Sequence, residues 1–233
     1  MTARALAIPA LVLLATSARA DAPKRARAWP GSVSPDGKLG VTVPDADHVK
    51  PGAHQNQLVD VATGKVVATL PSETVFENES HADMQPRWSP DSSTLVWYVD
   101  GKWGSLALVV AHVERGRLKW QTDVRELAVQ HLLKELRTAY PDAAAAVKKH
   151  GARGGGWFRD GLAIDVKPRP VDDDDDDAWD ALGFSVDATS DPKATDDPDD
   201  YKVTAKLSVE LAADGKLSFG TVRIAVTKPR SDE

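Results

Sequence analysis

Apolar and polar residues alternate in several short stretches of the chain, and this pattern predicts β-strands. The clearest case is residues 203–211, where every second position is apolar, so one face is expected to be buried and the other to face water. Shorter alternations occur at residues 162–166 and 184–188. Residues 217–226 return after an Asp-Gly turn, with a phase slip near Gly220 that predicts a β-bulge. The C-terminal part should therefore form an antiparallel sheet covered on one face.

A helical period replaces this alternation in the middle of the chain. Apolar residues recur on one face over residues 123–140, with Asp123 as the expected N-cap and Glu126 as its capping-box partner. Pro141 ends this helix and can begin a second one over residues 142–150. The two helices are expected to cover the C-terminal sheet, which predicts an α+β arrangement.

The first half contains a repeated β pattern. Residues 33–43 and 88–98 each carry a Ser-Pro-Asp turn followed by an apolar run, and Ser34 and Ser89 are 55 positions apart. Further along each copy, a second turn contains Gly64 or Gly116, which are 52 positions apart. Proline fixes φ in such turns, the Asp side chain bonds the local backbone, and a glycine adopts a left-handed conformation.

These segments resemble the WD40-like repeats of TolB-type β-propellers over residues 29–121, with Asp91-Ser92-Ser93 departing from the family's Asp-Gly-Lys in the second copy. The resemblance implies partner binding or scaffolding. A closed propeller needs at least four blades, and the sequence offers two copies. Either the rest of the chain forms degenerate blades, or the copies make an open β-meander capped by other elements. We favour the second arrangement.

The fold class expected from these patterns is α+β. An N-terminal propeller-like antiparallel β-meander would be followed by a central helix pair and a C-terminal antiparallel sheet. The predicted divisions are a signal peptide at 1–20, the meander at 21–121, and the helices with the C-terminal strands at 122–233.

The first twenty residues have the three parts of a secretory signal. A short positive start is followed by an apolar stretch too short to span a bilayer, and then by Ala18-Arg19-Ala20, a small-x-small cleavage pattern. An uncleaved anchor is the alternative. Because no later segment is apolar enough to cross a membrane, we expect a periplasmic or secreted protein that does not span the membrane after cleavage. It contains no cysteine, so its stability depends on its core.

The charge of the chain is concentrated in one segment. Residues 171–200 contain thirteen Asp and one Lys, a charge of −12 in a chain whose net charge is −6. The remainder is mildly basic, and no nucleic-acid partner is expected. The run of six Asp at 172–177 offers hard oxygen ligands for calcium, with Asp172, Asp174 and Asp176 as candidates. Its spacing does not match an EF-hand, so a solvated acidic loop is the alternative, and weakly bound calcium is the only cofactor suggested.

A second metal candidate and a glycan candidate come from other segments. Glu79, His81 and Asp83 alternate and would share one face of a strand, where they could bind a metal ion, with a polar loop as the alternative. Of the seven Trp residues, Trp88 and Trp97 occupy strand positions and are expected to be buried. Trp103 follows Gly101-Lys102 and is the best candidate for stacking on a sugar ring.

The sequence contains no catalytic motif, so no catalytic or cofactor-binding residue is assigned. We therefore predict an exported, non-enzymatic binding or scaffolding protein of the bacterial cell envelope, whose partner is an envelope protein or a glycan. One alternative is an envelope hydrolase whose carboxylate-based site assembles only in the fold. Another is a calcium-binding surface protein.

Overall fold

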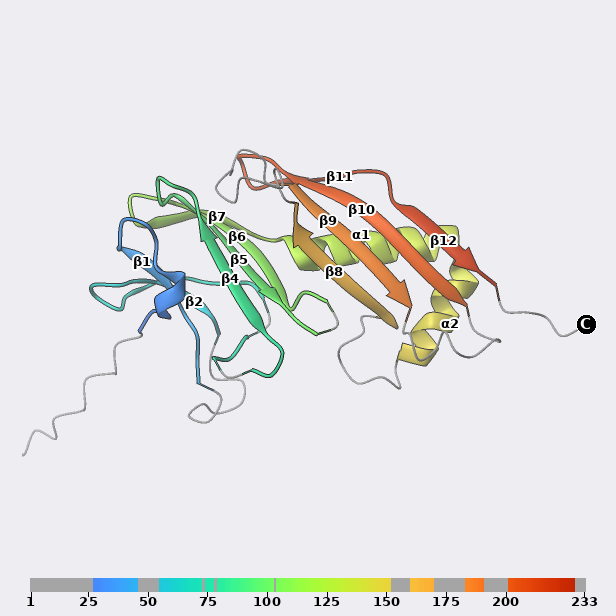
Figure 1. The fold of residues 1–233 in the computed structure, drawn as a ribbon. Helices are drawn as coiled ribbons and strands as arrows, with labels where there is room; N and C mark the ends of the chain where they lie inside the picture. Colours follow the sequence, from blue (N-terminus) through green and yellow to red (C-terminus); the bar gives the residue numbers. More distant parts are fainter. Residues whose placement is uncertain are drawn as a thin grey trace, which may run out of the picture.

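The computed structural model describes residues 27–45, 55–72, 74–77, 79–102, 104–151, 160–169, 183–190 and 201–228. Within these residues the chain forms three antiparallel sheets and a pair of α-helices, with the second sheet between the first sheet and the helices (Figure 1). This arrangement confirms the predicted α+β fold class. None of the helices in the described ranges is long and apolar enough to cross a membrane.

The sheets follow one another along the chain. The first has the order β1-β2-β3 and contains β1 (Leu39–Thr42), β2 (Gln57–Asp60) and β3 (Val66–Thr69). The second has the order β4-β5-β6-β7 and contains β4 (Asp83–Trp88), β5 (Thr94–Asp100), β6 (Ala107–Glu114) and β7 (Arg117–Asp123). The third has the order β11-β10-β9-β8, with β12 also on β10, and contains β8 (Leu162–Pro168), β9 (Gly183–Ser190), β10 (Lys202–Leu211), β11 (Leu217–Phe219) and β12 (Arg223–Thr227).

The two predicted Ser-Pro-Asp turns form with the same hydrogen bonds. The Ser34 hydroxyl donates to Asp36 at 2.8 Å and accepts from the backbone N–H of Leu39 at 3.0 Å. In the second copy the Ser89 hydroxyl donates to Asp91 at 2.6 Å and accepts from the N–H of the first residue of β5 at 2.9 Å. The repeat read from the sequence is therefore also a repeat of hydrogen bonds.

Three strands follow each turn, namely β1 to β3 after the first and β5 to β7 after the second. Before the second turn the chain forms β4, whereas before the first it forms the 3-10 helix η1 (Pro30–Ser32). Trp29, just before η1, pairs with β1, its N–H donating to the carbonyl of Val41 at 2.8 Å. The first two sheets are thus consistent with partial propeller blades, and the first has three strands in its described part.

The central strands of the second sheet, β5 and β6, are buried on both faces. All five residues from Leu95 to Val99 are buried, and alternate side chains point to opposite faces of the strand. Trp97 belongs to the core shared with the first sheet, whereas Val96 and Tyr98 belong to the core shared with the helices and the third sheet. Trp88 and Trp97 are buried as predicted. The chain therefore packs continuously from the first sheet through the second to the third.

Helix α1 (Val124–Ala139) begins where the sequence predicts. The Asp123 side chain accepts a hydrogen bond from the N–H of Glu126 at 2.8 Å and so caps the first turn. Helix α2 (Pro141–Gly151) follows directly. The buried face of α1 includes Leu132 and Leu136, as expected, but Leu127, which shares the apolar period, is 42% exposed. The apolar period alone does not bury Leu127, because the third sheet packs against the neighbouring face of α1.

The C-terminal hairpin also matches its pattern. Buried and exposed residues alternate along the whole of β10. The return strand is interrupted as predicted, since β11 and β12 both pair with β10 and the N–H of Gly220 between them donates to Ser208 at 2.9 Å. Helix α1 covers the inner face of this sheet (Figure 1).

Candidate functional site

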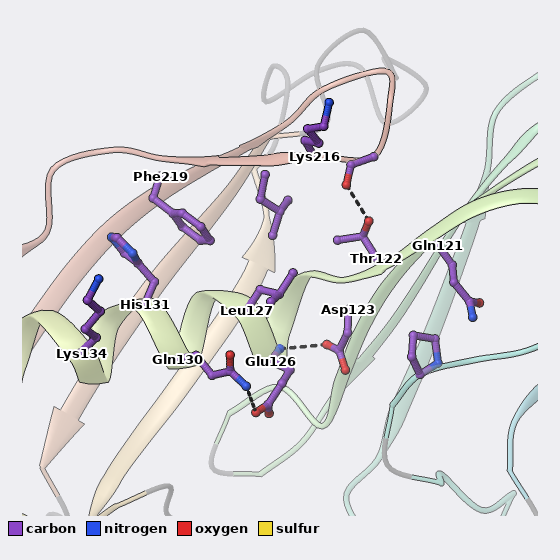
Figure 2. A pocket seen from close by; sticks show the side chains of 13 residues that line it. Gln121, Thr122, Asp123, Glu126, Leu127, Gln130, His131, Lys134, Lys216 and Phe219 are labelled. Carbon is purple, nitrogen blue, oxygen red and sulfur yellow. Dashed lines mark hydrogen bonds between the residues drawn. The ribbon is translucent and has the colours of Figure 1, made fainter.

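An open groove of about 880 Å³ lies where the end of β7, the first turns of α1 and the β10–β11 hairpin meet. Figure 2 shows side chains from all three elements around it. These elements are far apart in the sequence, so the groove exists only in the folded chain. Its walls are joined by specific hydrogen bonds rather than by loose packing.

The two β elements that form the walls are fixed to each other and to the first sheet. The Thr122 hydroxyl donates to the carbonyl of Gly215 at 2.7 Å, and the Gln121 side chain donates to the carbonyl of Thr69 at 3.0 Å. Gly215 has φ 82, and a Cβ there would lie 2.8 Å from the ring of Trp120. The hairpin turn therefore rests on the Trp120 ring, and this close approach requires glycine.

The floor of the groove is apolar. The exposed side chain of Leu127 lies one helical turn before His131, so both point to the same side of α1 (Figure 2). The His131 ring stacks on Phe219 of β11, with ring centroids 4.3 Å apart and an interplanar angle of 9°. Together Leu127 and the two stacked rings line the floor of the groove.

Polar side chains surround this surface. Gln130 donates to Glu126 at 2.8 Å, and Lys134 follows on the next turn of α1. On the hairpin Lys216 forms an ion pair with Asp214 at 2.5 Å, which raises the pKa of the lysine and lowers that of the aspartate. An apolar floor with a polar rim suits the binding of another polypeptide.

Several carboxyl groups of the described residues have pKa values shifted by their neighbours. The described carboxyl groups with a clearly shifted pKa all shift downward, because a neighbouring hydroxyl or ammonium group donates to the charged form; they are Asp36, Asp60, Asp91, Glu114 and Asp214. A carboxyl group that acts as a general acid near neutral pH needs a raised pKa, which is the opposite direction. These shifts belong to turns and surface ion pairs.

The metal candidates from the sequence lie at the start of β4 and in the turn before it, or lie outside the described residues. Glu79 and His81 lie in a turn before β4, where a Glu79 oxygen accepts from the N–H of Phe76 at 3.2 Å and His81 has φ 66. Asp83 begins β4 and pairs across the sheet with Asp100. In the described part of the chain no three His, Asp or Glu side chains come together to hold a metal ion. Asp172, Asp174, Asp176 and Trp103 lie outside the described residues, and their roles stay predictions.

The sequence did not single out the groove residues. Leu127 fits the apolar period of residues 123–140, and Phe219 lies within the returning stretch 217–226. The one available signal is the four-residue spacing of Leu127 and His131, which places both on one side of a helix. The partner ring comes from a hairpin almost ninety residues later, so its approach follows only from the tertiary fold.

No family model matches the chain, and a search of curated proteins finds no match. Among solved structures the chain is similar to the β-propeller domain of Nup133 from Vanderwaltozyma polyspora, with 15% identity and a TM-score of 0.34. The match covers 83% of this chain and 42% of that one, so the chain spans less than half of that propeller domain. A likeness at this level carries no argument about function.

Proposed function

We propose that this chain is an exported, non-enzymatic binding or scaffolding protein of the bacterial cell envelope, and that the groove in Figure 2 holds a protein partner. The observation that carries the proposal is the exposed Leu127 beside the stacked rings of His131 and Phe219. An exposed apolar side chain in a groove with a polar rim is typical of interaction surfaces.

A segment of a partner protein fits this groove chemically. An apolar side chain of the partner would cover Leu127 and the two rings and so remove their apolar surface from water. The backbone of the partner would meet hydrogen-bonding groups on the rim, among them Glu126, Gln130 and Lys134. Helices and extended segments both bind grooves of this kind.

The first two sheets belong, in this proposal, to a WD40-like repeat of the TolB type. The support is the matched set of hydrogen bonds in the turns at Ser34 and Ser89 and the three strands that follow each turn. We propose that they form an open scaffold, not a closed ring, and that the scaffold positions β7 at the groove.

The export half of the proposal depends on the sequence of residues 1–20. It is tested by expressing the full chain, and the chain lacking these residues, in a bacterium and separating periplasm, medium and cytoplasm. We expect the full chain outside the cytoplasm and shortened by cleavage after Ala20, and the truncated chain inside. Retention of the uncut full chain in the cytoplasm would contradict export.

The binding half is tested by affinity capture from envelope extract with the wild-type chain and two variants. Leu127→Asp places a charge on the groove floor, and aspartate is tolerated near the N-terminus of a helix. Val61→Asp is the matched control, because Val61 is exposed to a similar extent, 40% against 42%, but follows β2 in the first sheet. Thermal unfolding of all three proteins checks that each remains folded.

We expect a partner that wild type and Val61→Asp retain and that Leu127→Asp loses. Equal capture by both variants would place binding elsewhere and overturn the role of the groove. No specific partner, together with turnover on a panel of hydrolase substrates, would overturn the proposed function in favour of the hydrolase.

A further inference from the structure

Three side chains of α1 beside the groove carry a symmetric arrangement of charge. Glu126, Gln130 and Lys134 are spaced four residues apart, so they lie one above another on one side of the helix. All three line the groove, and Gln130 donates to Glu126 at 2.8 Å (Figure 2). The acid and the base therefore lie at equal distances from a central amide, in opposite directions along the helix.

This row of side chains is complementary to itself when two copies run in opposite directions. About a two-fold axis at Gln130, Glu126 of each copy faces Lys134 of the other, so both contacts join opposite charges. If the two helices ran in the same direction, each of these groups would face its own equivalent, and like charges would repel. The charges thus favour one orientation and one register.

The same complementarity continues at both ends of the row. Asp123, three residues before Glu126, would face Arg137, three residues after Lys134. Asp123 already caps α1, and Arg137 already forms an ion pair with Asp160. These two groups would therefore add a favourable electrostatic field between the copies rather than new ion pairs.

The two-fold axis also gives an occupant to the apolar floor of the groove. Leu127, which is 42% exposed, would lie between His131 and Lys134 of the second copy. The His131 ring is the one that stacks on Phe219, with ring centroids 4.3 Å apart. Each copy would thus cover the floor of the other with its own leucine. Burial of this apolar surface would drive association, while the ion pairs would fix the register.

We infer that the protein partner of the groove is a second copy of this chain, bound through α1 in an antiparallel contact that uses the same surface on both copies. This assignment rests on the proposed function, because it uses the same groove. The dipole of α1 also favours an acid near its start and a base near its end, but it gives no reason for the exposed leucine beside them. A contact made mainly by one helix from each copy is small, so the association is weak and reversible.

The test is sedimentation velocity of the chain purified from expression of the full sequence, at about 10 µM to 1 mM. The variants are Glu126→Lys, Lys134→Glu, the double variant that combines them, and Leu127→Asp. Lys206→Glu is the matched control for Lys134→Glu, because it reverses another exposed lysine, on the outer face of the third sheet. Thermal unfolding checks that every variant remains folded.

We expect the wild-type chain and Lys206→Glu to dimerise over this range. Each single reversal on α1 turns both ion pairs into repulsive contacts and should weaken dimerisation about tenfold, and Leu127→Asp should weaken it at least as much. The double variant should recover, because the reversed charges are again opposite. An equimolar mixture of Glu126→Lys and Lys134→Glu should form heterodimers for the same reason, which neither a folding defect nor the helix dipole would produce.

Three results would overturn the second copy as partner. They are a monomer at every concentration, a dimer that is indifferent to the reversals on α1, and failure of both the double variant and the mixture to recover. A monomeric chain that still captures another envelope protein through Leu127 would reject the second copy but leave the groove as the binding site. Loss of the Leu127 dependence in both experiments would reject the groove as well.

Discussion

The backbone N–H of Asp36 donates to the hydroxyl of Ser92 at 3.1 Å, so the Ser-Pro-Asp turn of the first repeat contacts the matching turn of the second. The two turns are equivalent in backbone shape as well. Gly37 has φ 72 in the first turn, and Ser92 occupies the same position in the second with φ 61. A serine thus adopts a left-handed conformation that usually favours glycine, and its side chain links the two sheets.

This contact predicts different outcomes for two substitutions of Ser92. Ser92→Ala removes the hydrogen bond and keeps the left-handed backbone, and should lower the free energy of unfolding by about 1 kcal/mol. Ser92→Gly loses the same bond but relieves a conformational strain of about 1 kcal/mol, so it should be close to neutral. Urea unfolding of both variants measures the difference. Equal destabilisation by alanine and glycine would show that the position is not strained.

Local determinants explain which parts of the fold could be predicted. The turns at Ser34 and Ser89 and the start of α1 at Asp123 form from side chains within five residues, so the sequence contains their whole explanation. The bulge at Gly220 and the alternation along β10 were equally visible, because strand periodicity does not depend on distant partners.

The groove at Leu127 and the strand pairing of the third sheet depend on long-range contacts and were not predicted. Leu127 fits the apolar period of α1, and only the placement of the third sheet leaves it in the groove. The opposition of Asp165 and Asp187 follows from strand register, and a shift of one residue would separate them to opposite faces. Neither fact has a signal within a short window of sequence.

The Asp36 carboxyl predicts a pH dependence of stability. A hydrogen bond from Lys38, followed by one from Ser34, lowers its pKa from 3.8 to about 2. Because the folded pKa is depressed, the charged form stabilises the fold above pH 3.8, and this contribution is lost as the pH falls toward 2. The pair is largely exposed, so we expect only a few tenths of a kcal/mol.

The measurement compares melting temperatures of wild type and Asp36→Asn at pH 6 and near pH 2. The small advantage of wild type should shrink on acidification and with added salt. Asp91→Asn is the control. The pKa of Asp91 is lowered first by a hydrogen bond from the Ser89 hydroxyl, and Ser93 stands where the first repeat has Lys38. The change in melting temperature caused by Asp91→Asn should therefore depend little on salt. An advantage of wild type over Asp36→Asn that grows at low pH would contradict the assignment.

The cap of α1 predicts a further stability effect, at the edge of the groove. Asp123→Ala removes the acceptor of the Glu126 N–H and should cost about 1 kcal/mol, whereas Asp123→Asn keeps an acceptor and should cost much less. Urea unfolding followed by far-ultraviolet circular dichroism measures both. Equal losses in the two variants would mean that the carboxylate charge, rather than the cap hydrogen bond, stabilises the helix end.

The contact between β8 and α2 predicts the most severe glycine substitution. Gly161, just before β8, has φ 85, and a Cβ there would lie 1.9 Å from the carbonyl of Val147 in α2. Gly161→Ala must therefore both strain the backbone and push α2 away, and we expect the free energy of unfolding to fall by about 3 kcal/mol.

Gly116 is the matched control, since it has φ 72 but no atom within 4 Å of its added Cβ, so Gly116→Ala should lower the free energy of unfolding by only about 1 kcal/mol. Urea midpoints give both values, and hydrogen exchange in α2 should accelerate in the first variant alone. Equal costs at the two glycines would mean that α2 does not pack on the start of β8 in solution.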